Sequence, residues 1–298
     1  MSASPSGDTP GPRGPGRCPD AIVIGATKAG TTSLFHYLSD HPQVFMDPQK
    51  ELRFFSDPDR HELGDDWYRR RFADAGDRVA MESSNAYTRD PVYPHVPERM
   101  AATCPDVRLV YLVRDPMARL ESHYRHRLAM GREWRTPSDA VTSDPGYVAA
   151  SLYGHQLARH LEHVPIERIH VARSERLFDD SDPARAELCA FLGIDHDPAR
   201  PWPRENTTRG RRVAPRLLRR AYGLRRSERI ARWGRRAAGV TAARSAGDGS
   251  FELDADVGAR LEERFRDDAR LLAELAGDRV AVPEATTRRS RSDDPEDA

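Results

Sequence analysis

A short apolar segment followed by a glycine-containing turn places the strongest constraint on how this chain can fold. Residues 21–24, Ala-Ile-Val-Ile, are apolar and mostly β-branched, which predicts a buried strand that ends at Gly25. After Gly30 apolar residues recur at helical spacing, and the hydroxyl-bearing residues 31–33 can begin a helix. The free N–H groups and the dipole of a helix N-terminus attract anions. The segment therefore predicts a cradle for a phosphate or sulfate group, with Lys28 inside the turn.

The spacing of Gly25 and Gly30 nearly matches the phosphate-binding loop of nucleoside triphosphatases, G-x-x-x-x-G-K-[ST], but Thr31 stands where the lysine belongs. No Lys-Ser/Thr pair is left to reach a γ-phosphate and to hold magnesium. We therefore expect a related cradle that binds a 5′-phosphate-linked group without an obligatory metal. No Cys/His spacing predicts a zinc site. The alternative is an ordinary strand–helix connection with a chance glycine.

Length and composition predict a globular protein without a membrane span. The 298 residues are 38% hydrophobic and 32% charged, and the formal net charge is zero, so we do not expect nucleic acid as a partner. No segment approaches the roughly 18 apolar residues that a membrane span needs. Residues 1–19 and 283–298 are expected to be a disordered leader and a disordered tail. Because the chain shows no secretion signal, and because Cys18, Cys104 and Cys189 form no disulfide framework, a cytoplasmic location is expected.

Alternating strand and helix patterns predict an α/β fold with a central parallel sheet that is flanked by helices. Further strands are expected at residues 44–46, 78–84, 107–113 and 168–172, and helices near 58–72, 91–102, 119–126, 147–163, 183–192 and 255–275. We expect one domain over residues 20–282, with an arginine-rich helical lid or insert at about 204–245. Ligands of such sheets bind beyond the carboxyl ends of the strands, so the loop 25–32 and the residues after 113 should converge there.

Three separate segments together resemble one enzyme family. The segments GATKAGTTSL, KELRFFS and RLVYLVRDPMARLESHYRH, with a weaker ENTTRGR, are similar to those of sulfotransferases that use 3′-phosphoadenosine 5′-phosphosulfate (PAPS), particularly the heparan sulfate N- and 3-O-sulfotransferase domains. The resemblance implies a fold like that of P-loop nucleotide kinases and PAPS as the sulfuryl donor. It also implies transfer to a hydroxyl or amine of a glycan, glycolipid or small-molecule acceptor, by a scheme that requires no metal.

The resemblance further implies roles for individual residues. The donor-binding set is Lys28, Ala29, Gly30, Thr31, Thr32, Ser33, Arg114, Ser122, Arg209 and Gly210. In this set the loop 28–33 matches the part that holds the 5′-phosphosulfate, and the remaining residues match the binding site of the 3′-phosphate. An arginine can bind a phosphate through two parallel charge-assisted hydrogen bonds, and a serine about two turns along the helix can add a hydroxyl donor. Glu51 matches the general base, and Lys28 would stabilise the leaving phosphate oxygen.

Several alternatives remain open from the sequence. Glu82, a carboxylate at the end of a predicted strand, rivals Glu51 as the base. Members of the family often have His and Asp where this chain has Arg53 and Ser56, a departure that concerns the acceptor more than the donor. The alternative enzyme is a P-loop-type nucleotide or small-molecule kinase, which would need magnesium and a triphosphate. The non-enzymatic alternative is a binder of nucleic acid or anionic membranes through residues 204–236.

Overall fold

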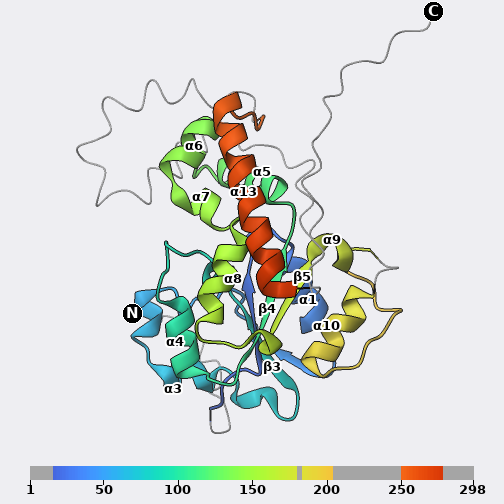
Figure 1. Cartoon of the computed structure of the whole chain (residues 1–298). Coiled ribbons are helices and arrows are strands. Elements are labelled where there is room, and N and C mark those ends of the chain that lie inside the picture. The colour runs from blue at the N-terminus through green and yellow to red at the C-terminus, as the bar shows by residue number, and fades with distance from the viewer. Residues whose placement is uncertain (1–15, 180–182, 204–249, 278–298) are drawn as a thin grey trace, which may run out of the picture.

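The computed structural model describes residues 16–179, 183–203 and 250–277 of the chain. Within these residues a five-stranded sheet runs through the centre of the molecule in the order β2-β3-β1-β4-β5 (Figure 1). The strands are β1 (Ala21–Gly25), β2 (Val44–Met46), β3 (Val79–Ser83), β4 (Arg108–Val113) and β5 (Ile169–Arg173). All four neighbouring pairs are parallel. In Figure 1 α4 and α8 lie on one side of the sheet and α1 and α10 on the other, which confirms the predicted architecture.

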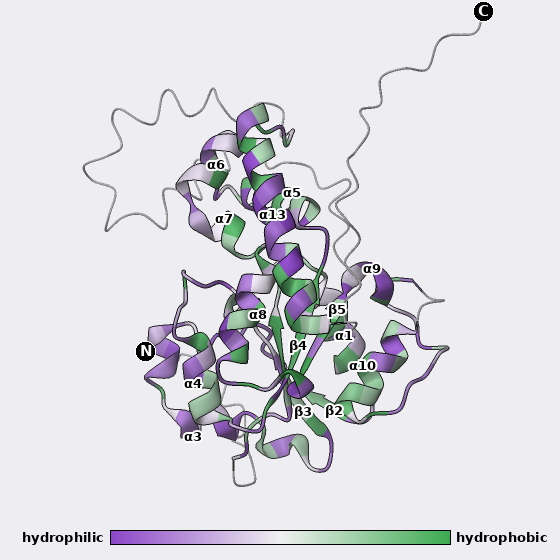
Figure 2. Ribbon diagram, in the orientation of Figure 1, coloured by the Kyte–Doolittle hydropathy of each residue, from purple (hydrophilic) through white to green (hydrophobic). Residues whose placement is uncertain are grey.

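Continuous apolar runs explain why β1 and β4 occupy the middle of the sheet. Residues 21–24 of β1 and 109–112 of β4 have no solvent exposure. Strands of a parallel sheet that is covered on both faces need such runs, and Figure 2 shows the central strands as hydrophobic, with hydrophilic residues on the surrounding helices. The pairing of β1 with β4 shifts register between Val23 and Gly25. The chain therefore leaves the sheet at Gly25, where the predicted cradle begins.

Helices occur in all the described regions where the sequence predicts them, and α6 and α9 are additional helices that were not expected. They are α1 (Thr31–Ser39), α2 (Pro58–His61), α3 (Asp65–Arg70), α4 (Val96–Thr103), α5 (Pro116–Ala129), α6 (Pro137–Ser143), α7 (Pro145–Ala149), α8 (Tyr153–Leu161), α9 (Ser174–Leu177), α10 (Ala184–Leu192) and α13 (Ala255–Ala276). The three-residue 3₁₀ turns are η1 (Ala73–Ala75), η2 (Asn85–Tyr87) and η3 (Ile166–Arg168).

Three expected helices have different bounds for identifiable reasons. The helix expected at 58–72 is divided at Gly64, whose φ is 80°. The one expected at 91–102 begins only at Val96, because the prolines at 91 and 94 disfavour helical conformation in the residues before them, whereas Pro97 lies in the first turn of α4, where its missing N–H needs no partner. The helix expected at 147–163 is interrupted at Ser151, whose hydroxyl accepts a hydrogen bond from Arg119 (2.5 Å) and donates one to Pro116 O (3.0 Å).

A second apolar cluster holds together the helices that lie beyond the sheet. Side chains of α5, α6, α7 and α13 form this cluster, which is distinct from the large core around the sheet. Figure 1 shows α13 running past α8 towards α5, α6 and α7. On α13, the Asp268 carboxylate accepts hydrogen bonds from the backbone N–H groups of Gly154 (2.9 Å) and His155 (2.8 Å) at the start of α8. A carboxylate is favourable there because the helix N-terminus is partly positive.

Most of the expected leader, the whole arginine-rich segment and the expected tail lie outside the described residues. Of the leader, residues 16–19 are described, and the Arg17 backbone N–H donates to Arg69 O (3.1 Å). We propose that residues 20–282 form one domain, since both apolar clusters contain residues of the C-terminal helix α13.

Cys18 and Cys104, which are 86 residues apart in the sequence, meet where β1 and β4 begin. Their Sγ atoms lie 2.6 Å apart, with the Cys104 thiol donating to Cys18. The hydrogen bond from Cys104 lowers the pKa of Cys18 to about 7. The thiolate, which is the reactive form of cysteine, is therefore well populated at neutral pH. The spacing of the cysteines could not predict this contact, because it depends on β1 lying beside β4.

We expect Cys18 and Cys104 to form a disulfide on exposure to glutathione disulfide. The Cys18 thiolate attacks the glutathione disulfide, and Cys104 then displaces the bound glutathione. Intact-mass measurement should show the loss of two hydrogen atoms, reversed by reductant. The free energy of unfolding should rise by about 4 kcal/mol, because the unfolded chain then carries a long closed loop. Cys189→Ser should behave like the wild type and Cys104→Ser should not crosslink. Three free thiols after oxidation would contradict the prediction.

Candidate functional site

The loop between β1 and α1 forms a cradle at the carboxyl edge of the sheet. Gly30 is the N-cap of α1 with a φ of 90°, and no side chain of the described residues caps this helix. The N–H groups at the start of this helix, those of Thr31 and Thr32, are thus oriented to bind an anion. Glycine is favoured at position 30 because of this φ, and a Cβ there would also require the tip of the Phe178 ring, 2.8 Å away, to shift.

The loop is held in place by side chains from neighbouring elements. Its carbonyl groups accept hydrogen bonds in three successive positions: Arg119 Nη1 to Thr27 O (3.5 Å), Arg114 Nη1 to Lys28 O (3.2 Å) and Ser174 Oγ to Ala29 O. Arg119 is fully buried, and this burial lowers its pKa to about 10, so the guanidinium stays charged at neutral pH. Because the carbonyl groups are already engaged, the loop conformation is set before any ligand binds.

Strained backbone is concentrated in two segments of the site. Among the described residues, the non-glycine residues with positive φ are Lys28 (69°), Glu51 (66°) and Arg53 (57°). Such conformations are uncommon for these residue types and persist where the surrounding structure enforces them, often at functional sites. The strain therefore coincides with the loop and with the KELRFFS segment, the two regions that the sequence had marked.

Residues 50 and 51 bring an ammonium group and a carboxylate to the cradle. Lys50 Nζ donates to Thr32 Oγ1 (2.9 Å) and lies 3.7 Å from Glu51 Oε1. Glu51 Oε2 accepts a hydrogen bond from the Asn85 backbone N–H (3.1 Å), and the Glu51 N–H donates to Ser83 O (2.9 Å) at the end of β3. Burial raises the pKa of Glu51 and lowers that of Lys50, while the charge of each residue opposes the shift of the other. Glu51 is thus a carboxylate of increased basicity beside the loop.

Glu82 lies near Glu51 in the fold but in a different environment. It is fully buried, and its carboxylate accepts hydrogen bonds from Tyr68 (2.6 Å), Tyr87 (3.1 Å) and Ser84 (3.0 Å). Burial raises the pKa of Glu82 to about 7, although the three hydroxyl donors act in the opposite direction. The two carboxylates that the sequence left as alternatives are therefore separated: Glu51 lies at the cradle and Glu82 is enclosed in the core.

The residues expected to bind a 3′-phosphate are described only in part. Arg114 directly follows β4, and its guanidinium contacts the loop through the carbonyl group of Lys28. Ser122 lies on the buried face of α5 and is 6% exposed. Arg209 and Gly210 lie outside the described residues. The loop and Arg114, 86 residues apart in the chain, are therefore brought together at one edge of the sheet.

The sequence analysis assigned no site role to four residues that shape the site. These are Lys50, Asn85, Arg119 and Ser174. Lys50 stands out in the sequence, since it and Lys28 are the two lysines of the chain. Ser174 follows β5 directly, so the rule that ligands bind beyond strand ends also pointed to it. The burial of Arg119 has no counterpart in the local sequence pattern.

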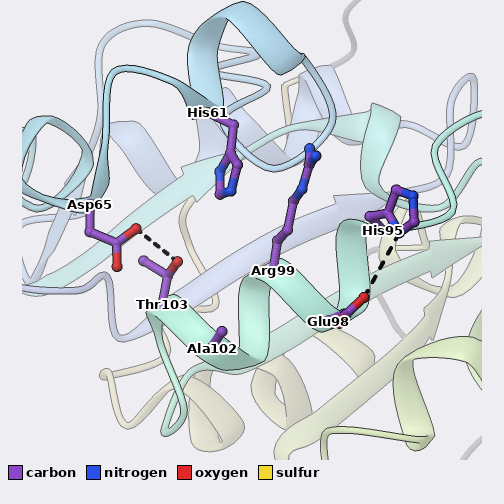
Figure 3. A pocket seen from close by; sticks show the side chains of 7 residues that line it. All are labelled: His61, Asp65, His95, Glu98, Arg99, Ala102 and Thr103. Atoms are coloured by element: carbon purple, nitrogen blue, oxygen red, sulfur yellow. Dashed lines mark hydrogen bonds and ion pairs between the residues drawn. The ribbon is translucent and has the colours of Figure 1, made fainter.

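A separate pocket of about 620 Å³ lies along α4 (Figure 3). It is lined by His61, Asp65, His95, Glu98, Arg99, Ala102 and Thr103. Two contacts join residues that line this pocket: the hydrogen bond from Thr103 to Asp65 (3.0 Å) and the ion pair of His95 with Glu98 (3.8 Å). It shares no lining residue with the cradle, so we do not regard it as part of the candidate site.

In the described part of the chain, no cluster of His, Cys, Asp and Glu side chains is arranged to hold a metal ion. None of its helices combines the length and apolar character needed to span a membrane.

Comparison with known proteins identifies the family. The family model described as the sulfotransferase domain matches residues 18–208. Human heparan sulfate glucosamine 3-O-sulfotransferase 5 is 30% identical over 190 residues, covering 59% of this chain and 54% of that protein. Human bifunctional heparan sulfate N-deacetylase/N-sulfotransferase 2 is 27% identical over 200 residues, covering 60% of this chain and 22% of that protein. This chain therefore matches about half, or less, of the length of these relatives.

A solved structure extends the similarity beyond the matched segment. The crystal structure of a sulfotransferase from Alicyclobacillus acidocaldarius superimposes with a TM-score of 0.60 and 25% identity, covering 87% of this chain and 96% of that chain. The similarity supports the P-loop-like fold that the sequence predicts, and these matches do not favour the kinase alternative.

The same comparisons correct one expectation and settle the family. These relatives contradict the expected cytoplasmic location, because the matched heparan sulfate sulfotransferases are enzymes of the Golgi lumen. The expectation failed because it relied on a polar N-terminal segment and on the spacing of the cysteines, and neither feature determines the compartment of a protein. Because the family model matches well over half of the residues, the chain belongs to the sulfotransferase domain family.

Proposed function

We propose that this protein transfers a sulfuryl group from PAPS to a hydroxyl or amine group of a glycan, lipid-linked or small-molecule acceptor. The observation that carries the proposal is the meeting of three groups at one sheet edge: the uncapped N-terminus of α1, the Arg114 guanidinium and the Glu51 carboxylate. The first two can hold the two phosphate-bearing ends of the donor, and the third can accept a proton. The glycan-modifying activities in the names of the relatives support a glycan acceptor.

The residues present fit a donor with anionic groups at both ends. The N–H groups of residues 30–33 and the Lys28 ammonium would hold the 5′-phosphosulfate. Arg114 and Ser122 would hold the 3′-phosphate, with Arg209 and Gly210 closing over it. Lys50 adds a second ammonium group, because its Nζ already lies 2.9 Å from Thr32 Oγ1 in the first turn of α1. Two lysines, one guanidinium and a helix N-terminus balance the negative charge of such a donor.

The proposed chemistry is an in-line transfer in which positioning and electrostatics do most of the catalysis. Glu51 accepts the proton from the attacking hydroxyl or amine, and its raised pKa makes it a stronger base than an exposed glutamate. Lys28 and Lys50 stabilise the negative charge that grows on the leaving phosphate oxygen. Glu82 keeps a structural role, since it is enclosed by three hydroxyl donors. The scheme needs no metal, because ammonium and N–H groups supply the positive charge.

Calorimetry with 3′-phosphoadenosine 5′-phosphate (PAP), the desulfated donor, tests the proposal directly. With chelator present, the protein should bind PAP more tightly than ATP. Lys28→Ala and Arg114→Ala should each weaken PAP binding roughly tenfold to a hundredfold, because each removes a charge-assisted contact. The exposed Arg266 of α13 offers a control, and Arg266→Ala should bind PAP normally. A higher affinity for ATP with magnesium than for PAP would contradict the proposal and favour a kinase.

Replacement of Glu51 should separate turnover from donor binding. Glu51→Gln should lower the rate of labelled-sulfate transfer by about 10²–10⁴-fold, the usual contribution of a general base. PAP affinity should change little, since the glutamine keeps the side-chain volume and an acceptor for the Asn85 N–H. Equal losses of turnover and PAP affinity would reassign Glu51 to a structural role. Glu82→Gln serves as the comparison and should keep most of the transfer activity.

Glu82 should make the stability of the protein depend on pH. Its pKa in the folded state, about 7, lies above its ordinary 4.5, so folding favours the protonated form. The free energy of unfolding should therefore be largest below pH 4.5 and decrease as the pH rises through about 7, by at most about 3 kcal/mol. Urea unfolding of the wild type and Glu82→Gln at matched pH values measures this difference. Parallel curves for the two proteins would show that Glu82 does not titrate in this range.

A further inference from the structure

Two arginines close to Glu51 share one aromatic ring. Arg53 lies two residues after Glu51, and its Nη2 donates to the Tyr93 hydroxyl (2.8 Å). The Cζ atoms of Arg53 and Arg89 lie 5.8 Å and 5.7 Å from the centre of the Tyr93 ring. The cation–π contacts hold both guanidinium groups beside the same tyrosine. We refer to Arg53, Arg89 and Tyr93 as the Arg89 cluster.

Arg89 lacks the partners that a half-buried guanidinium normally has. Its Nε atom is enclosed and has no hydrogen-bond partner, and within the described part of the chain no carboxylate forms an ion pair with the side chain. Burial lowers the pKa of Arg89, Tyr93 and the nearby Asp144 oppose this shift, and the charges of Arg127 and Arg53 add to it. Buried charges are normally paired, because the desolvation of an unpaired charge is unfavourable. Among the described residues, the Arg89 guanidinium therefore lacks a directly paired carboxylate.

The nearby carboxylate of Asp144 already has hydrogen-bond partners on both of its oxygen atoms. Its Oδ2 accepts from Arg127 Nη1 (2.7 Å), and its Oδ1 accepts from the Gly146 N–H (3.0 Å) at the start of α7. Gly146 also makes room for Arg89, because a Cβ at that position would lie 2.8 Å from Arg89 Nη2. The Arg89 guanidinium thus lies between the Tyr93 ring and α7, and this site is formed by three separate parts of the chain.

The Arg89 cluster is linked to the Glu51 carboxylate through Arg53, whose charge lowers the pKa of Glu51 against the effect of burial, and along the chain through η2. The turn η2 begins with Asn85, whose N–H binds Glu51, and Arg89 follows two residues after this turn ends. On the other side, Arg53 belongs to the same strained segment as Glu51. A molecule whose hydroxyl group reached Glu51 would therefore place its neighbouring substituents towards Arg53, which shares the Tyr93 ring with Arg89.

We propose that the Arg89 cluster is a subsite for an anionic group of the acceptor, a carboxylate or a phosphate or sulfate ester close to the group that is sulfated. The inference rests on the proposed function, since it takes Glu51 to face the acceptor. The Arg89 guanidinium can donate charge-assisted hydrogen bonds to such an anion from its Nη groups, and the anion would supply the ion-pair partner that Arg89 lacks. Tyr93 offers an aromatic surface beside the bound group. Arg89 is then a specificity-determining residue that selects acidic over neutral acceptors.

Three probes that differ only at one exocyclic carbon test this inference. They are methyl β-D-glucoside, methyl β-D-glucuronide and methyl β-D-glucoside phosphorylated at the exocyclic oxygen. Binding of each to the PAP-loaded protein is followed by ligand-observed NMR, and sulfuryl transfer from PAPS by label incorporation. The wild type should bind at least one anionic probe about tenfold or more tightly than the neutral one, as expected for a charged hydrogen bond. The preferred probe distinguishes a carboxylate from a phosphate-type group.

Arg89→Gln should lose the preference for the anionic probe, and Arg89→Lys should keep part of it, while both bind PAP like the wild type. Arg266→Gln, on the exposed face of α13, should keep the full preference. A wild type that shows no preference for charge, or no saturable binding of any probe, would overturn the inference while leaving the proposed function standing. Weaker PAP binding by Arg89→Gln would also overturn it, because the guanidinium would then serve the donor. Failure of the wild type to bind PAP would instead overturn the proposed function.

Discussion

The interaction on which the rest of the site depends is the set of hydrogen bonds to the carbonyl groups of the β1–α1 loop. Arg119, Arg114 and Ser174 come from α5, the end of β4 and the start of α9, and they engage three successive carbonyl groups. These bonds hold the loop in a conformation with an unusual φ at Lys28 and leave the N-terminus of α1 uncapped. Their effect is preorganisation: the N–H groups are oriented before a ligand binds, so little reorganisation accompanies binding.

Glu51 and Glu82 both lie near the end of β3, but they differ in burial and therefore in the chemical role that each can have. Glu82 is enclosed by hydroxyl groups, whereas Glu51 keeps partial exposure beside Lys50 and the loop. Both have a raised pKa for the same physical reason, the loss of water around a negative charge. Their different accessibility, and not the pKa shift alone, makes Glu51 the better candidate to meet a substrate. The same reasoning applies to Arg89, a partly buried cation whose Nε has no hydrogen-bond partner and which forms no ion pair within the described residues.

Much of the fold could be predicted because its central elements have strong local patterns. The apolar runs of β1 and β4 are bounded by Gly25 and by Arg114-Asp115-Pro116, and the parallel sheet follows from alternating strands and helices. The loop residues and Arg114 could be predicted for the same reason, since each directly follows a strong strand. The interruption at Ser151 could not be predicted, because it depends on a hydrogen bond from a helix 32 residues earlier. The location of the protein was wrongly expected, because composition does not report a compartment.

By itself the sequence determined the order of the central elements, the parallel sheet and the strand–glycine–helix loop, because apolar period, glycine position and helix-starting residues are local properties. Only the tertiary structure decided which polar side chains became enclosed and which stayed at the edge of the sheet. Glu82 and Arg119 were enclosed, Glu51 and Lys50 were left beside the loop, and Cys18 was brought to Cys104. The physical reason is that desolvation and pairing depend on contacts between segments far apart in the chain, which no local pattern encodes.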